Sequence, residues 1–185
     1  RKYILEFKPE IVGISIIYSS DLHSMLRLAK LIKEVNSETV VVAGGIHPSI
    51  YPKEVLRESY VDSKVTIDYV IRGEGEIRFA DFILNMKEGM IDLKADGMCG
   101  WHEGEMFINP QIKTIEDLGS LPFPAYHRLP MEKYFKFNVP FSPFPRGNRV
   151  MQVYASRGCP VGCTFCSSTN FNKAHRSRSP DNVIR

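Results

Sequence analysis

The chain has 185 residues, of which 43% are hydrophobic and 24% charged, an ordinary balance for a globular protein. Its formal charge of +3 is too small to indicate nucleic acid as a partner, and its apolar runs are far shorter than the ~20 residues that a membrane span requires. Three of its four cysteines lie within eight residues, whereas secreted disulfide scaffolds spread theirs along the chain, so we expect a reducing, cytoplasmic setting.

The first ninety residues alternate between two hydrophobic patterns. Runs of β-branched apolar residues predict buried strands at 11–17, 40–43 and 68–71. Apolar residues at helical spacing predict helices at 22–35, 52–59 and 77–87. Asp21 is a plausible N-cap for the first of these helices. Strand–helix alternation with short connections predicts a parallel, doubly wound α/β sheet of the Rossmann-like (flavodoxin-like) kind, and we assign it to residues 1–90.

The pattern changes after about residue 90. Residues 94–108 hold three glycines among apolar residues and predict a small β-hairpin. The proline-rich stretch that follows disfavours regular helix or central strand over most of its length, so 91–149 is interpreted as a hairpin and a connector whose aromatic residues pack on neighbouring surfaces. A strand is predicted at 150–155, and Ser179 is the expected N-cap of a final helix. We expect a fragment of a longer protein, truncated at both ends, with 150–185 opening another domain.

A C-x3-C-x2-C array follows the predicted strand at 150–155. Cys159, Cys163 and Cys166 carry thiolates, the usual protein ligands of iron–sulfur clusters. Three ligands to a four-iron cluster would leave one iron open to a non-protein ligand. The intervening Gly158, Pro160 and Gly162 disfavour a helix with three cysteines on one face, which is the first alternative.

Zinc is the second alternative to an iron–sulfur cluster. Structural zinc usually takes four ligands in two well-separated pairs, whereas this array is one compact trio. The remaining cysteine, Cys99, lies sixty residues upstream and is predicted to be a small apolar residue of the hairpin. Incidental cysteines are the third alternative.

With Phe165 in the aromatic position, the segment resembles the C-x3-C-x-aromatic-C pattern of the radical S-adenosylmethionine (SAM) superfamily. The resemblance implies that Cys159, Cys163 and Cys166 hold a [4Fe-4S] cluster, that Phe165 belongs to the cofactor site, and that the open iron binds SAM. It further implies reductive cleavage of SAM to a 5′-deoxyadenosyl radical, a small-molecule substrate, and an electron donor such as ferredoxin or flavodoxin. Residues 150–185 would then be the start of a radical SAM (β/α) barrel.

A second motif lies in the α/β part. Ser15 and Ile17 end the first predicted strand, and Gly44 and Gly45 follow the second, with 26 residues between Ile17 and Gly44. This resembles the S-x-L…G-G part of cobalamin-binding domains, with isoleucine in place of leucine. It implies that Ser15 bonds the nucleotide tail of cobalamin, and that the glycines let the tail approach the carboxyl edge of the sheet, where ligands of open α/β sheets bind. The alternative is that both glycines are only turn residues.

Three further residues are candidates for the same site. His47 follows the glycine pair and could face the cofactor, although a loop role is the alternative. Gly73 and Glu74 lie in the Gly-Glu-Gly-Glu turn and could meet a polar edge of the cofactor, or Glu74 could simply be a charge at a helix N-terminus.

The order of these motifs resembles cobalamin-dependent radical SAM proteins, in particular the group resembling the anaerobic magnesium-protoporphyrin IX monomethyl ester oxidative cyclase. It implies cobalamin-assisted methyl transfer or oxidative ring formation. Two other classes stay open: an iron–sulfur electron-transfer module without SAM chemistry, and an α/β interaction domain without a cofactor.

Overall fold

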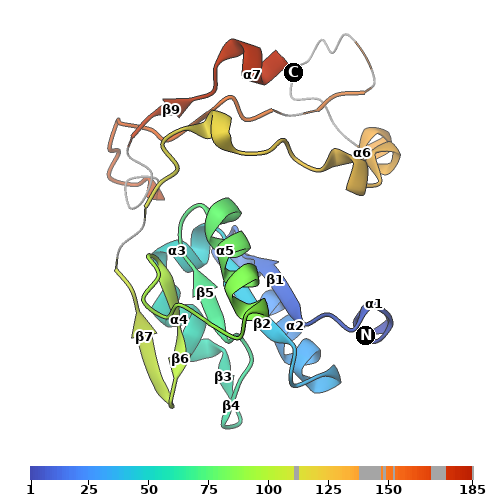
Figure 1. Cartoon of the computed structure of the whole chain (residues 1–185), viewed down its shortest axis with the longest axis vertical. Helices are drawn as coiled ribbons and strands as arrows, with labels where there is room; N and C mark the ends of the chain where they lie inside the picture. The colour runs from blue at the N-terminus through green and yellow to red at the C-terminus, as the bar shows by residue number, and fades with distance from the viewer. Residues whose placement is uncertain (111–112, 138–146, 148, 152, 168–173, 185) are drawn as a thin grey trace. The chain divides into compact units, whose positions relative to one another are not determined.

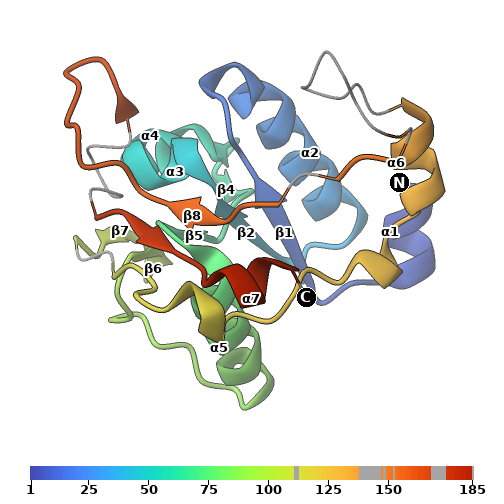
Figure 2. The ribbon, with the colours of Figure 1, turned by 90° about the horizontal axis from the view of Figure 1, so that it is seen from above.

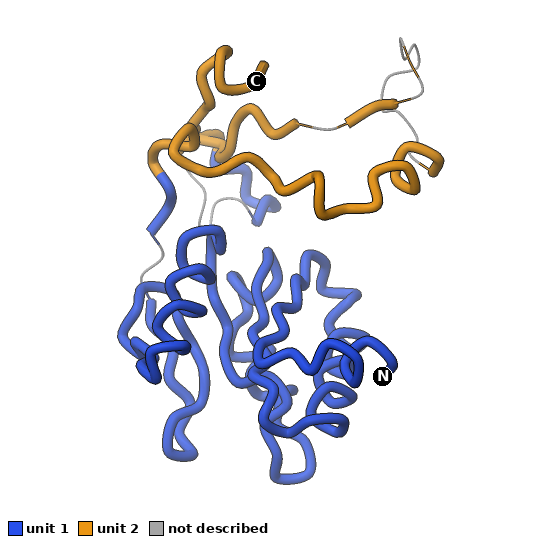
Figure 3. Tube along the Cα trace, turned by 45° about the vertical axis from the view of Figure 1, so that its right-hand side comes forward, with its two compact units in different colours: residues 1–115, 162–171 blue, residues 116–161, 172–185 orange. Residues whose placement is uncertain are grey.

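The computed structural model describes residues 1–110, 113–137, 147, 149–151, 153–167 and 174–184 (Figure 1). The chain forms two compact units, shown in two colours in Figure 3. Unit 1 comprises residues 1–115 with 162–171, and unit 2 comprises residues 116–161 with 172–185. The domain boundaries at 90 and 149 stay predictions. Among the described residues, no helix is long and apolar enough to cross a membrane.

Unit 1 is built on a sheet whose strand order is β1-β2-β5-β6-β7. Its strands are β1 (Ile11–Ser15), β2 (Val40–Gly44), β5 (Tyr69–Ile71), β6 (Met98–His102) and β7 (Glu105–Ile108). The first three strands are parallel, which confirms the predicted α/β fold. The predicted hairpin is β6 and β7, but it joins the same sheet because β6 pairs antiparallel with β5, so the sheet is mixed and not wholly parallel. The exposed edge of β5 would otherwise leave backbone groups unpaired.

The three helices predicted within residues 1–90 are all present in unit 1. They are α2 (Leu22–Val35), α4 (Pro52–Glu58) and α5 (Gly75–Lys87). Elements that the sequence did not predict are α1 (Lys2–Phe7), η1 (Ser19–Asp21), α3 (Ile46–Ile50), and the short paired strands β3 (Tyr60–Val61) and β4 (Lys64–Val65). Asp21 occupies the N-cap position of α2 as predicted, although its side chain makes no capping hydrogen bond.

Helices cover both faces of the sheet (Figure 2). Val41 and Ala43 of β2 pack with α2 and α4 on one face, whereas Val42 packs with α5 on the other. This alternation follows from the two-residue period of a strand. Because both faces are covered, the strands between them are continuously apolar, and each fully buried valine or isoleucine contributes about 1.5–3 kcal/mol to stability.

The described residues of unit 2 form short elements. They are η2 (Leu118–Ser120), η3 (Tyr126–Arg128), α6 (Met131–Phe137), β8 (Ser156–Arg157), β9 (Arg176–Ser177) and α7 (Pro180–Ile184). Helix α6 lies in the connector, in the interval that follows Pro130. The aromatic- and proline-rich segment 141–145 of that connector lies outside the described residues.

The strand predicted at 150–155 is wrong for the described residues of that segment. The short strand β8 comes directly after it and pairs antiparallel with β9. A strand forms where a neighbouring strand satisfies its backbone groups. Within the described residues, β9 pairs with Ser156 and Arg157, and beside them Ala155 O accepts a hydrogen bond from Arg178 N at 2.8 Å. The predicted cap of the last helix is confirmed, because Ser179 Oγ accepts a hydrogen bond from Asn182 N at 3.2 Å.

Candidate cofactor site

The parallel strands of unit 1 end at one edge of the sheet, which we call the carboxyl edge. Ser15 of β1 lies opposite Gly44 of β2, and Ile16 N donates to Gly44 O at 2.8 Å. The structure thus brings Ser15 and the glycine pair together, as the motif requires. Ser15 is exposed there, and Ile17 lies just beyond the strand with 47% of its surface exposed. Open α/β sheets bind ligands at such an edge.

The two glycines differ in what they allow. Gly45 has φ 101° and ψ −171°, a backbone region open essentially to glycine alone, and a Cβ there would lie 2.7 Å from Ile16 O. Turn geometry and close packing therefore explain Gly45 without a ligand. A Cβ on Gly44 would meet only Ile71 O, at an ordinary 3.5 Å. The packing of the fold therefore does not require glycine at position 44, and the missing side chain leaves free space there.

Ser49 of α3 ties together the loops that follow β2 and β5. Its hydroxyl donates to Gly45 O at 2.6 Å and accepts from Gly73 N at 2.8 Å. The Arg72 guanidinium adds a bond from Nε to Ser49 O at 3.1 Å. This buried serine was not among the residues predicted from the sequence. The available signal was a serine four residues after Gly45 in a short helix, where the hydroxyl bonds the carbonyl one turn back.

His47 lies in α3 and not in a loop. It is 3% exposed, and its Nδ1 lies 2.9 Å from the hydroxyl of Ser19. The imidazole is therefore inside the wall of the carboxyl edge, between the segments that follow β1 and β2. Ser19 is a second residue that the sequence analysis missed, because the contact joins residues 28 positions apart.

Gly73 and Glu74 form the turn after β5. Gly73 has φ 80°, which glycine adopts without strain. Glu74 precedes α5, and its Oε2 accepts a hydrogen bond from Ile115 N at 2.7 Å. Ile115 is the last residue of the first segment of unit 1, so this hydrogen bond occupies one carboxylate oxygen of Glu74. A contact of Glu74 with a cofactor stays a prediction.

Large apolar side chains are exposed along the carboxyl edge. Ile17 and Tyr18 follow β1, whereas Ile46 and Tyr51 follow β2, and they are 43–67% exposed. Exposed side chains of this kind beside hydroxyl and backbone polar groups suit a large ligand that is partly apolar. A corrin ring with polar side chains fits this description.

The cysteine array is a loop, as predicted, and not a helix. Gly158 and Gly162 adopt left-handed φ values of 88° and 72°, which interrupt any regular helix or strand in the array. Cys166 N donates to Cys163 O at 3.0 Å, and Phe165 is 90% exposed. None of the array's cysteines is in a disulfide.

The three cysteines of the array are divided between the two units. Cys159 belongs to unit 2, and Cys163 and Cys166 belong to unit 1. Within the described ranges, no three His, Cys, Asp or Glu side chains are grouped to hold a metal ion. The donor set and the turns fit a cluster loop, and the metal role of these residues stays a prediction. Cys99 is fully buried in β6, as expected, and burial raises the pKa of its thiol.

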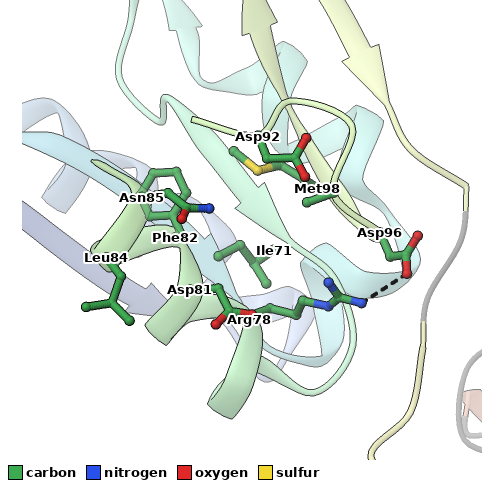
Figure 4. A pocket seen from close by; sticks show the side chains of 10 residues that line it. Ile71, Arg78, Asp81, Phe82, Leu84, Asn85, Asp92, Asp96 and Met98 are labelled. Atoms are coloured by element: carbon green, nitrogen blue, oxygen red, sulfur yellow. Dashed lines mark hydrogen bonds and ion pairs between the residues drawn. The ribbon is translucent and has the colours of Figure 1, made fainter. Parts of the chain in front are cut away.

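A separate cavity of about 200 Å³ lies in unit 1 between α5 and residues 92–98 (Figure 4). Its wall contains an ion pair between Arg78 Nη2 and Asp96 Oδ2 at 3.0 Å, and Lys113 Nζ lies 2.8 Å from the same carboxylate. The hydrogen bond from Lys113, aided by the charges of both cations, lowers the pKa of Asp96. The carboxylate is satisfied by these partners, so we assign the cluster to the stability of unit 1.

Comparison with known proteins agrees with this arrangement. Residues 1–83 match the B12 binding domain family. The chain is 33% identical, over 99% of its length, to cytidylyl-2-hydroxyethylphosphonate methyltransferase of Streptomyces wedmorensis, of which it covers 37%. It is 32% identical, over 100% of its length, to anaerobic magnesium-protoporphyrin IX monomethyl ester cyclase of Rubrivivax gelatinosus, of which it covers 31%. The chain thus spans about a third of the length of these curated relatives.

A solved structure shares the fold. It is the radical SAM methyltransferase TsrM from Kitasatospora setae with cobalamin and a [4Fe-4S] cluster bound, matched with a TM-score of 0.64 and 18% identity over 99% of this chain and 35% of that one. The mixed sheet and its carboxyl edge therefore define a Rossmann-like α/β domain of the B12-binding class. Residues 1–83 thus carry a B12-binding domain, and the chain is similar to proteins named anaerobic magnesium-protoporphyrin IX monomethyl ester cyclase and cobalamin-dependent radical SAM methyltransferase.

Proposed function

We propose that the full-length protein is a cytoplasmic radical SAM enzyme that cleaves SAM at a [4Fe-4S] cluster and uses cobalamin to transfer a methyl group to a small-molecule substrate. Oxidative ring formation is the second candidate, because relatives named as methyltransferases and as cyclases are almost equally similar to this chain. An electron donor such as ferredoxin or flavodoxin would reduce the cluster. The observation that carries the proposal is the C-x3-C-x-F-C loop in a chain whose residues 1–83 match a B12 binding domain.

Each part of the chain has a distinct task in this proposal. Cys159, Cys163 and Cys166 would supply three thiolates and leave one iron for SAM, and backbone amides near the left-handed Gly158 and Gly162 would bond cluster sulfides. At the carboxyl edge, the exposed apolar side chains would cover part of the corrin ring, and Gly44 would leave room for the nucleotide tail. When bound, the cluster and SAM supply a carbon-centred radical and cobalamin supplies the methyl group, while the protein positions them and excludes side reactions.

Metal analysis tests the cluster. The full-length protein, purified and reconstituted without oxygen, should contain about four irons and four sulfides per chain. Cys163→Ala should lose most of both. Cys99→Ala is the matched control, because that thiol is buried in β6 and should leave the iron content unchanged. Stoichiometric zinc in place of iron, or equal iron in both variants, would refute the cluster assignment.

Two further measurements separate the alternatives. Release of 5′-deoxyadenosine from SAM by the reduced full-length protein would exclude an electron-transfer module without SAM chemistry. Binding of hydroxocobalamin would exclude an interaction domain without a cofactor. Protein that cleaves SAM but retains no corrinoid after reconstitution would contradict the cobalamin part of the proposal and leave the cluster part standing.

A further inference from the structure

His47 is a buried side chain with one unused nitrogen. Its Nδ1 contacts Ser19 Oγ, whereas its Nε2 is shielded from solvent and has no hydrogen-bond partner among the described residues. Leaving a buried polar atom unpaired destabilises a fold, and an apolar side chain of similar size would avoid that loss. Because Nε2 adds no hydrogen bond to the stability of the fold, the contact of Nδ1 with Ser19 is the feature that distinguishes this histidine from an apolar side chain.

The imidazole is held in place from two sides. The amide of His47 donates to Ile16 O at 3.1 Å, at the end of β1, and its carbonyl accepts from Tyr51 N at 2.9 Å. The His47 and Tyr51 rings lie 5.5 Å apart between centroids, at 42°. The ring therefore has a fixed position relative to the ends of β1 and β2, where the ligand of an open α/β sheet binds.

Ser19 is the exposed partner of this buried ring. It begins η1, directly after the exposed Ile17 and Tyr18. A hydroxyl has one donor hydrogen and two acceptor lone pairs, and the bond to Nδ1 uses only one of these three. The imidazole thus orients a hydroxyl that still has hydrogen-bonding capacity and that directly follows two exposed apolar side chains.

We propose that His47 is a positioning residue for the corrinoid: it orients the Ser19 hydroxyl, and Ser19 hydrogen-bonds a polar group of the bound cofactor. This inference rests on the proposed function. The polar group is either a side-chain amide of the corrin ring or the phosphate of the nucleotide tail, and cobinamide, which lacks the nucleotide, distinguishes them.

The test is a set of dissociation constants for hydroxocobalamin, measured on the full-length protein without oxygen. Ser19→Ala and His47→Leu should each weaken binding about tenfold, the effect of losing one oriented hydrogen bond. His47→Asn places an amide where Nδ1 lies and should stay within about threefold of wild type. His23→Leu is the control, since His23 is exposed on α2, and it should change nothing.

Stability separates positioning from a merely structural role. His47→Leu removes the unpaired Nε2, so its melting temperature should equal or exceed that of wild type while its affinity falls. If cobalamin does not bind to the wild type, the proposed function fails and this inference fails with it. If the wild type binds and either Ser19→Ala or His47→Leu binds equally well, only this inference is overturned.

Ser19→Ala is at an exposed position and decides the matter even if His47→Leu does not fold. Loss of affinity for cobalamin but not for cobinamide assigns the contact to the nucleotide tail, and equal loss for both assigns it to the corrin ring.

Discussion

The glycine pair of the carboxyl edge offers a test in which neighbouring, chemically identical substitutions have opposite outcomes. Gly45→Ala forces a side chain into a glycine-only backbone region, which costs about 1–3 kcal/mol. The new Cβ would also lie 2.7 Å from Ile16 O, and such overpacking costs a further ~1–3 kcal/mol. We therefore expect Gly45→Ala to lose about 2–6 kcal/mol of unfolding free energy, a large part of the ~5–15 kcal/mol of a typical domain.

Gly44→Ala should behave in the other way. Its φ is not positive, and its Cβ would have only an ordinary contact at 3.5 Å with Ile71 O. Stability should be unchanged or higher by up to ~1 kcal/mol, because alanine restricts the unfolded chain. If the nucleotide tail of cobalamin passes over Gly44, the added methyl group should weaken binding by about 1.4–2.8 kcal/mol, which is about 10- to 100-fold.

The assay pairs urea unfolding with cobalamin titration for each variant of the full-length protein. Stable Gly44→Ala protein with wild-type affinity for cobalamin would refute the reasoning that this glycine makes room for the ligand. Wild-type stability of Gly45→Ala would refute the packing argument. Weaker binding by Gly45→Ala carries no weight alone, because a destabilised edge would bind less well for any ligand path.

Two other predictions concern the support of the site. Ser49→Ala should weaken cobalamin binding about fivefold or more, because it releases the loops after β2 and β5. The control Ser59→Ala removes a similarly buried hydroxyl bonded to its own helix, and it should lower stability by about 0.5–1.5 kcal/mol without a specific change in affinity. Equal affinities of the two variants for cobalamin would contradict this role of Ser49. Asp96 has a lowered pKa in the folded state, so its stabilisation is complete above the ordinary aspartate pKa of about 3.9 and is lost as pH falls through the lower folded value. Asp96→Asn should therefore be less stable than wild type at pH 7, and the difference in unfolding free energy, measured in urea, should shrink below pH 4; a difference independent of pH would disprove the contribution of the ion pairs with Lys113 and Arg78.

The sequence predicted the elements that depend on local pattern. The helix at 22–35 and the cap at Ser179 follow from periodicity and capping chemistry, which nearby residues decide. The strand predicted at 150–155 is absent from the described residues of that segment, because apolar, β-branched composition does not by itself supply a pairing neighbour, and the pairing with β9 is found at Ser156 and Arg157. The placement of the hairpin in the main sheet likewise depended on a pairing that no local pattern reveals.

The candidate site divides in the same way. Ser15, Gly44 and Gly45 could be identified from spacing, because the ends of parallel strands necessarily meet at one edge. The contacts of Ser49 and Ser19 could not, since each joins segments more than twenty residues apart whose approach is set by the packing of α3. Hydroxyl groups are too common in sequences for one of them to stand out without its partner.

The hydrogen bond from Ile115 N to the Glu74 carboxylate joins two distant parts of the chain. Glu74 is in the turn after β5, at the carboxyl edge, and Ile115 is the last residue before the chain continues as unit 2. The backbone at Ile115 is therefore tied to the turn after β5. The carboxylate that the sequence offered as a cofactor contact thus holds the backbone at the point where the first segment of unit 1 ends.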